Sequence, residues 1–255
     1  AIMSGYFPLR VRCWRMFVVT AALACGAVGC REQKPAPVSQ PTNTPPPRVE
    51  PRLPPPAAPT NAPPKNRFEG RTAAELFQTG LKFWEGKGVE RDAAEAVQLF
   101  RAAAKGGSIE AQAYLGAAYR SGTGVPVDVT EALWWFREAA EQGHARSQGV
   151  LGAMYGTGEG GKRDLAEAAK WYRRAAEQGL VAAQANLGAM HYLGQGVARD
   201  PVEAYKWLHL AAQKGDQGAV KNRGMVAQKM TTAQMAEGRK RAAEFTPRKA
   251  AAGQP

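Results

Sequence analysis

The chain has 255 residues, of which 44% are hydrophobic, 8% aromatic and 22% charged, and its formal net charge is +12. The excess of basic residues lies outside the central body, because residues 72–215 contain 16 basic and 16 acidic residues. A neutral body argues against a nucleic-acid-binding protein, and the three cysteines all precede residue 31, which excludes a disulfide framework for the rest of the chain.

The first 30 residues have the pattern of a secretory signal peptide. Arg10, Arg12 and Arg15 precede the apolar run "MFVVTAALACGAVG", and the chain becomes polar as "REQK" after Cys30. The apolar run has about fourteen residues, whereas a membrane-spanning helix needs roughly twenty. A cleaved leader is therefore favoured over a permanent transmembrane anchor.

The end of this leader resembles a bacterial lipobox, in which a cysteine becomes the lipidated first residue of the mature protein. "AVGC" at 27–30 predicts lipid attachment at Cys30, and "ALAC" at 22–25 offers Cys25 as the alternative. Both have alanine where the lipobox has leucine, and simple cleavage after Ala24 also fits. Arg31, rather than aspartate, follows Cys30. The expected location is the outer membrane, facing the periplasm, or the periplasm itself if the leader is only cleaved.

Residues 31–71 are predicted to form a disordered, proline-rich stalk. There are 13 prolines between Pro35 and Pro64, and proline lacks the amide donor that helices and sheets require. An extended chain of this length, at about 3.1 Å per residue, reaches on the order of 100 Å. The stalk is expected to hold the following domain away from its anchor.

The segment 72–215 contains four ungapped repeats of 36 residues: 72–107, 108–143, 144–179 and 180–215. Each begins with a helical pattern, shown by Ala111, Leu115 and Tyr119 on one face. A glycine recurs within this first helix, where it predicts close helix packing: Gly80, Gly116, Gly152 and Gly188. Its expected partners are paired alanines late in the second helix: Ala103 and Ala104, Ala139 and Ala140, Ala175 and Ala176, Ala211 and Ala212.

The loop between the two helices, "GTGVPVDVTEA" in the second repeat, has glycines that could suggest a phosphate-binding loop. No strand precedes it and no Gly-Lys-Ser/Thr sequence is present. Its glycines instead predict helix C-caps (Gly86, Gly122, Gly158, Gly194), and its aspartates predict N-caps with a glutamate three residues later, as in a capping box (Asp92, Asp128, Asp164, Asp200). The second helix then carries a bulky pair that predicts core packing: Leu99 and Phe100, Trp135 and Phe136, Trp171 and Tyr172, Trp207 and Leu208.

These columns, legible in "AYLGAAYRSGTGVPVDVTEALWWFREAAEQG", resemble the Sel1-like repeat, a relative of the tetratricopeptide repeat. The resemblance implies an all-α fold, a right-handed α-solenoid of four helix-turn-helix repeats whose groove binds proteins or peptides. Residues 216–246 resemble the helical cap that ends such arrays, with Thr231 and Gln234 placed as another capping box. Residues 247–255 are expected to be a disordered tail.

A catalytic centre is not predicted. His144, His191 and His209 fall in three different repeat columns, and no Ser/His/Asp set or metal-ligand spacing is present. We therefore expect no cofactor and no metal. An enzyme acting on cell-wall fragments is the least favoured function.

Partner recognition is expected from outward columns that vary while the framework columns stay fixed. These positions are Trp84, Tyr114, Arg120, Arg146, Asn186 and Tyr192, with Trp134 as a separate anchor on the outer face. The sequence thus predicts an exported, lipid-anchored adaptor for a protein or peptide partner, with no nucleic acid bound. The alternative is a protein that binds the cell wall or an anionic surface through its basic C-terminal region.

Overall fold

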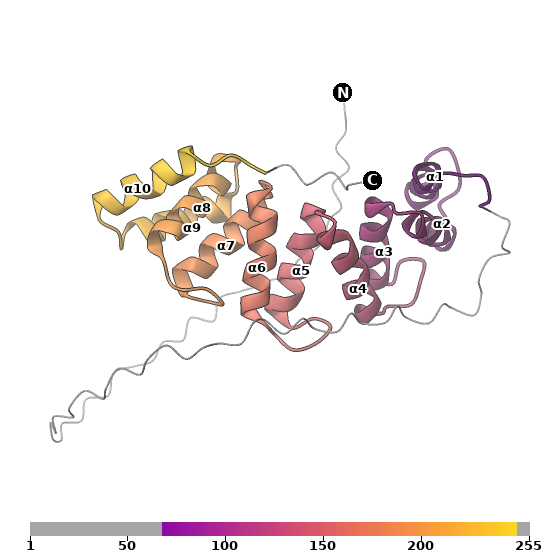
Figure 1. Cartoon of the computed structure of the whole chain (residues 1–255), viewed down its shortest axis with the longest axis horizontal. Coiled ribbons are helices and arrows are strands. Elements are labelled where there is room, and N and C mark those ends of the chain that lie inside the picture. Colours follow the sequence, from indigo (N-terminus) through magenta and orange to yellow (C-terminus); the bar gives the residue numbers. More distant parts are fainter. Residues whose placement is uncertain (1–67, 249–255) are drawn as a thin grey trace, which may run out of the picture. The chain divides into compact units, whose positions relative to one another are not determined.

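The computed structural model describes residues 68–248, which contain ten helices and no strand within that range (Figure 1). The helices are α1 (Ala73–Glu85), α2 (Ala93–Lys105), α3 (Ile109–Ser121), α4 (Val129–Glu141), α5 (Ala145–Thr157), α6 (Leu165–Glu177), α7 (Val181–Leu193), α8 (Pro201–Gln213), α9 (Gln217–Ala227) and α10 (Thr232–Ala243). The predicted signal peptide, Cys25, Cys30 and the stalk up to residue 67 lie outside the described residues. None of the helices between residues 68 and 248 is long and apolar enough to cross a membrane.

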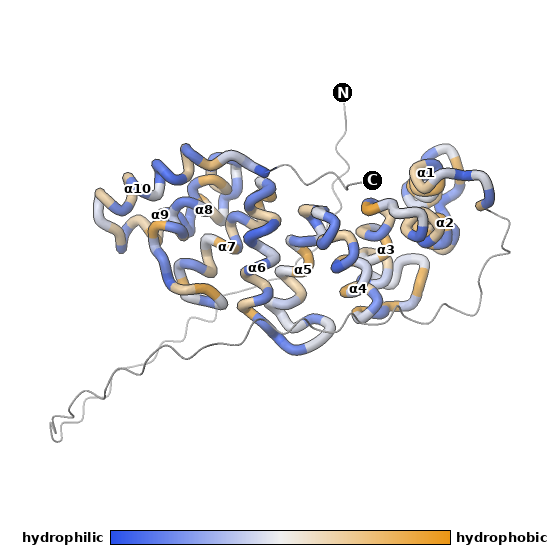
Figure 2. Tube along the Cα trace, viewed as in Figure 1, coloured by the Kyte–Doolittle hydropathy of each residue, from blue (hydrophilic) through white to orange (hydrophobic). Residues whose placement is uncertain are grey.

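The first eight helices form four hairpins that stack in chain order. Within each repeat the two helices pack together, as α1 does on α2, and the second helix then packs on the first helix of the next repeat, as α2 does on α3. Apolar and polar segments alternate along these helices, as Figure 2 shows. The predicted all-α solenoid is confirmed.

The helices end and begin at the C-cap and N-cap residues that the sequence predicts. The four loop glycines are left-handed C-caps, with φ between 69° and 82°, and each predicted aspartate accepts a hydrogen bond from the backbone of the glutamate three residues later. The reciprocal half of a capping box is absent at these four aspartates. Their backbone N–H groups donate instead to the preceding helix, as Asp92 does to the carbonyl of Phe83 at 3.0 Å. The glutamate side chains are therefore available for other contacts.

The mid-helix glycines do mark close approach, but the predicted partner was wrong. A Cβ at Gly116 would lie 2.8 Å from the Phe136 ring, and one at Gly152 would lie 2.7 Å from the Tyr172 ring. The bulky second-helix residue, not the alanine pair, fills the space that glycine leaves. The alanine pairs are mostly buried and contribute to the core, as predicted for small residues between helices.

The core runs from repeat to repeat. Trp171 of α6, for example, packs in one cluster with Phe136 of α4 and Leu151 of α5. Most of the predicted bulky core residues are buried, including Leu99, Phe100, Phe136, Trp171, Trp207 and Leu208, whereas Trp135 and Tyr172 are half-buried. Each repeat thus completes its core only with its neighbours.

Buried glutamines add polar links within and between repeats. Gln148 is 4% exposed, and its Nε2 donates to the carbonyl of Ala140 in the preceding repeat at 2.9 Å, while its Oε1 accepts from Gln178 at 2.7 Å. Gln184 repeats the first contact with the carbonyl of Ala176, and Gln112 repeats the second with Gln142. These bonds satisfy both ends of an amide that would otherwise be buried at a cost.

The last two helices close the stack. Asp216 caps α9 at the position where a fifth repeat would start, and α9 and α10 both pack on α8. Thr231 and Gln234 form the predicted capping box of α10. Beyond α10, Pro247 lies against Gly179, and the backbone N–H of Arg248 donates to the carbonyl of Glu177 at 2.8 Å. The expectation of a disordered tail therefore does not hold for these two residues.

Candidate partner-binding surface

Two of the predicted site residues, Trp84 of α1 and Tyr114 of α3, are in contact, and the charge of a third, Arg146 of α5, acts on Tyr114. The rings of Trp84 and Tyr114 meet edge to face, with centroids 6.1 Å apart, and Phe77 packs against Tyr114 at 5.5 Å. Trp84 is only 7% exposed, so the prediction that it faces outward was wrong; its ring supports Tyr114 from the core. Tyr114 is half-buried and Arg146 is exposed. We call Tyr114, Arg146 and the underlying Trp84 the first-helix surface.

Charged groups surround the hydroxyl of Tyr114. Burial raises the pKa of Tyr114, the carboxylate of Glu85 adds to this, and the nearby cations Arg146 and Lys87 oppose it. Lys87 is itself paired with Glu85 at 2.6 Å. The phenol is protonated at neutral pH, so its hydroxyl is both a hydrogen-bond donor and an acceptor.

Two other predicted residues stand apart from this surface. The guanidinium of Arg120 binds the carboxylate of Glu159 through two hydrogen bonds, at 2.7 and 2.8 Å, and thereby joins α3 to the loop between α5 and α6. The charge of Arg120 is thus paired with a carboxylate of the next repeat. Asn186 is exposed on α7, in the fourth repeat.

Tyr192 and Trp134 lie in further, separate environments. The ring of Tyr192 is half-buried between two cations, with Arg199 at 5.9 Å and Lys229 at 5.7 Å from its centroid. Trp134 is half-buried and packs edge to face on Trp135, with centroids 4.4 Å apart. The predicted residues therefore form one multi-repeat surface and several isolated positions.

One recurring polar contact between repeats was not predicted. Arg101 binds the hydroxyl of Tyr119, and Arg137 binds the hydroxyl of Tyr155, each 18 residues further along the chain. Arg173 contacts Nε2 of His191 at 3.3 Å with the same spacing. The sequence alone carries a sign of this contact. The column of Arg101, Arg137 and Arg173 holds His209 in the fourth repeat, and the residue 18 positions after His209 is Ala227 instead of a tyrosine or histidine.

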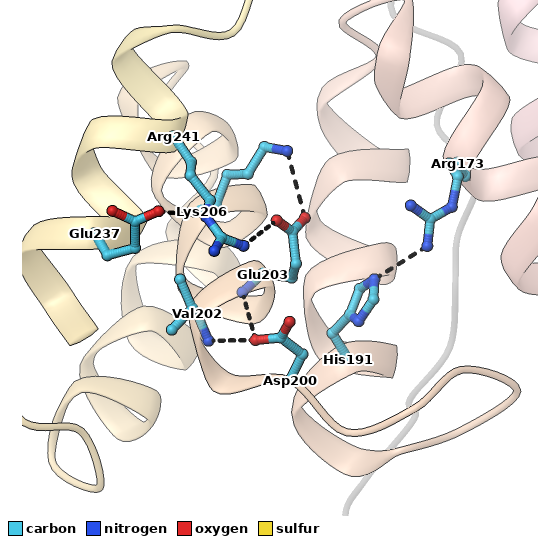
Figure 3. Close-up of polar contacts among 8 residues, drawn as sticks. All are labelled: Arg173, His191, Asp200, Val202, Glu203, Lys206, Glu237 and Arg241. Carbon is cyan, nitrogen blue, oxygen red and sulfur yellow. Dashed lines mark hydrogen bonds and ion pairs between the residues drawn. The ribbon is translucent and has the colours of Figure 1, made fainter.

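In this series of arginine contacts, His191 therefore occupies the position that a tyrosine has in the two preceding repeats. It is 6% exposed, and Figure 3 shows its ring facing Arg173. Burial lowers the pKa of His191, and the Arg173 charge lowers it further, although Asp200 and Glu203 act in the opposite direction. The folded chain thus favours the neutral imidazole.

Replacing His191 by tyrosine is expected to reduce the loss of stability at acidic pH. A histidine with a lowered folded-state pKa contributes fully above its unfolded pKa of about 6.5 and loses that contribution as the pH falls below it. Thermal unfolding of the wild type and of His191→Tyr, followed between pH 7.5 and 5.5, measures the difference. The variant should lose less in Tm, while the lowered pKa values of His144 and His209 leave some acid sensitivity in both proteins. Parallel pH profiles would contradict this assignment.

A second polar cluster attaches α10 to the repeats. Figure 3 shows Glu203 of α8 between Lys206 and Arg241, and Arg241 also binds Glu237. Burial of Glu203 opposes its ionisation, but the hydrogen bonds and charges of Arg241 and Lys206 outweigh this and lower its pKa. Arg241 is thus bound within the fold, which reduces the basic charge on which the surface-binding alternative depends.

Within residues 68–248, no group of three or more histidine, cysteine, aspartate or glutamate side chains is arranged to hold a metal ion. The three histidines lie on separate helices or helix ends and contact different arginine or serine side chains. The arrangement observed suits packing and recognition.

Comparisons with known proteins agree with this geometry. The family model described as Sel1 repeat matches residues 76–108, 109–144, 145–180 and 181–216, the last three lying one residue later than the predicted repeats. The chain is similar to the crystal structure of a Sel1 repeat protein from Oxalobacter formigenes, with 34% sequence identity, a TM-score of 0.58, and coverage of 68% of this chain and 74% of that one.

A second solved structure is c5321, a protective antigen present in uropathogenic Escherichia coli strains that displays an SLR fold. It is 23% identical, with a TM-score of 0.34 and coverage of 69% of this chain and 61% of that chain. No curated protein sequence matches the chain.

Proposed function

This chain belongs to the Sel1 repeat family, and from that premise we propose that it is an exported, lipid-anchored adaptor whose first-helix surface binds a protein or peptide partner. A stack of helical hairpins supplies a broad rigid surface to which each repeat adds a few side chains. Binding is the role for which such a surface is suited.

The observation that carries this proposal is the contact of Trp84 with Tyr114 across two consecutive repeats, with the charge of Arg146 from the third repeat acting on Tyr114. The buried Trp84 ring holds Tyr114 in place, and the exposed Arg146 lies close enough to influence the pKa of Tyr114. Tryptophan, tyrosine and arginine are the residues that most often dominate binding energy at protein interfaces. A rigid aromatic support also lowers the entropy that binding must cost.

The double substitution Tyr114→Ala and Arg146→Ala is expected to weaken partner binding at least tenfold, since loss of a single interface hot spot costs about 2 kcal/mol or more. Crosslinking in cells followed by mass spectrometry identifies the partner, and a pull-down then measures its capture. Arg120 is left intact, because its loss would break the contact with Glu159 between repeats.

Asn186→Ala provides the matched control. Asn186 occupies the same repeat column as Tyr114, and it is exposed on α7. Capture should be unchanged in this variant, and helicity by circular dichroism should be unchanged in both. Undiminished capture by the double variant would remove the first-helix surface from the proposal.

The proposed location rests on the leader and the proline-rich stalk that the sequence predicts. Lipidation at Cys30 would tether the chain to the periplasmic face of the outer membrane, with the stalk presenting the repeats to their partner. Membrane fractionation of Cys30→Ala, with Cys25→Ala as control, tests this part independently. Release of the Cys30 variant alone supports it, and membrane association of both variants contradicts attachment at Cys30.

A further inference from the structure

The chain turns back onto the repeats after α10 ends. Phe245 packs against Trp207 of α8, with ring centroids 5.3 Å apart and an interplanar angle of 72°. Phe245 also joins Leu180 and Leu210 around the buried cluster of α6, α7 and α8. Residues 245–248, which we call the C-terminal segment, thus begin with an aromatic side chain seated on the last repeat.

The rest of this segment follows the junction of α6 and α7. The ring of Pro247 lies 3.5 Å from the position that a Cβ would take at Gly179, so a side chain there would meet it. Arg248 then makes two contacts with Glu177: its backbone N–H donates to the carbonyl at 2.8 Å, and its Nη1 binds the carboxylate Oε2 at 3.2 Å. An aromatic anchor, a proline contact, a main-chain hydrogen bond and a charge pair together form the contact pattern of a bound peptide.

The equivalent tryptophans of the second and third repeats, Trp135 and Trp171, are covered by residues of their own helices. Trp134 packs on Trp135 in α4, and the guanidinium of Arg174 lies 4.6 Å from the ring centroid of Trp171 in α6. In α8 the column of Arg174 holds Leu210, the ammonium of Lys206 lies 4.4 Å from the ring centroid of Trp207, and Phe245 of the C-terminal segment packs on the same ring. The ring of Trp207 is therefore contacted both from its own helix and by a segment that lies outside the repeats.

The contacts of the C-terminal segment are largely exposed. Phe245 is only half-buried, and Thr246, Pro247 and Arg248 are exposed. The side chains of the Arg248–Glu177 pair are 79% and 30% exposed, and exposed ion pairs contribute little to stability. The main-chain hydrogen bond and the aromatic anchor are contacts that another peptide can reproduce.

We propose that Glu177, Gly179, Leu180, Trp207 and Leu210 form a second peptide-binding surface, which the C-terminal segment occupies in the isolated chain. It accepts from another protein an exposed segment of the same chemistry: an aromatic residue, then a proline two positions later, followed directly by arginine or lysine. The charge of Glu177 selects the basic residue, and Leu180, Trp207 and Leu210 select the aromatic one. This surface shares no residue with the first-helix surface, so it goes beyond the adaptor function proposed above.

The test uses the full chain with the segment released by Phe245→Ala and Arg248→Ala, which leaves α10 and its contacts with Glu203 in place. The probe is a fluorescent peptide, Glu-Phe-Thr-Pro-Arg-Lys, followed by fluorescence polarisation. The released variant should bind one peptide per chain. The wild type should bind at least tenfold more weakly, because its own segment competes at an effective concentration in the millimolar range.

Two matched variants test whether the peptide binds at the proposed surface. Adding Glu177→Lys to the released variant should abolish peptide binding, whereas adding Glu141→Lys, at the same column of the repeat before, should leave it unchanged. A peptide with alanine in place of phenylalanine should not bind. Binding that persists in the released variant carrying Tyr114→Ala and Arg146→Ala separates this surface from the first one.

Several outcomes would overturn the proposal. Absence of binding by the released variant would show that the segment is only a packing element, and equal binding with Glu177→Lys would place the peptide elsewhere. If the wild type forms dimers in light scattering that the released variant does not form, the occupant is the segment of a second copy and not a partner protein.

Discussion

Replacing Gly196 by alanine is expected to destabilise the fold by about 3–5 kcal/mol, whereas the same change at Gly88 should cost about 1–2 kcal/mol. Both glycines occupy the same loop position and have positive φ, 68° and 74°. A Cβ at Gly196 would stand 2.0 Å from the carbonyl oxygen of Leu165, on the backbone of the preceding repeat. At Gly88, in the first described repeat, a Cβ would have nothing within 4 Å.

The comparison separates two costs that normally occur together. Left-handed backbone strain is common to both variants, and the clash with the beginning of α6 is present only at Gly196. Urea unfolding followed by circular dichroism at 222 nm gives both free energies. Equal losses would mean that this loop does not pack on the neighbouring repeat.

A second pair of substitutions, on helix α5, should act in opposite directions. Gly152→Ala is expected to destabilise by about 2 kcal/mol, because the new Cβ would lie 2.7 Å from the Tyr172 ring and overpacking outweighs the better helix propensity. Gly156→Ala should stabilise by up to about 1 kcal/mol, since its Cβ would meet Ala168 at an ordinary 3.7 Å.

Because both glycines lie in the same helix, their intrinsic propensity gains are similar, and the difference reports the packing against Tyr172 alone. Thermal unfolding of the two variants beside the wild type measures the sign of each effect. A stabilised Gly152→Ala would contradict the close approach of the Tyr172 ring to α5.

Local signals in the sequence predicted the helices well. Helix ends depend on residues within a few positions, so the C-cap glycines and N-cap aspartates could be assigned from one repeat and checked against the others. The partner of Gly116 could not be assigned in this way. Phe136 and the alanines after it share a helix whose rotation against α3 is set by packing, and packing depends on three-dimensional contacts.

The binding surface was harder to predict, for the same reason. Trp84 occupies a variable column, which indicated an exposed position, but α1 begins the described stack and its tryptophan fills the space beside Phe100 and Tyr114. Arg120 looked available until the fold brought Glu159, which lies 39 residues away in sequence, to its guanidinium. Variation between repeats shows which positions the repeat framework does not fix. Only the fold shows whether the side chain at such a position reaches solvent.

The contacts between repeats have a consequence for how the molecule assembles. The arginine contacts between repeats join residues 18 positions apart, and the glutamine pairs within repeats join residues 30 apart, so these contacts close short loops of chain. Such low contact order favours rapid folding that can nucleate in any adjacent pair of repeats and spread outward. The bond from Arg248 to Glu177 closes a loop of 71 residues, so we expect it to form after the last repeats have stacked, and because it is exposed it adds little to their stability.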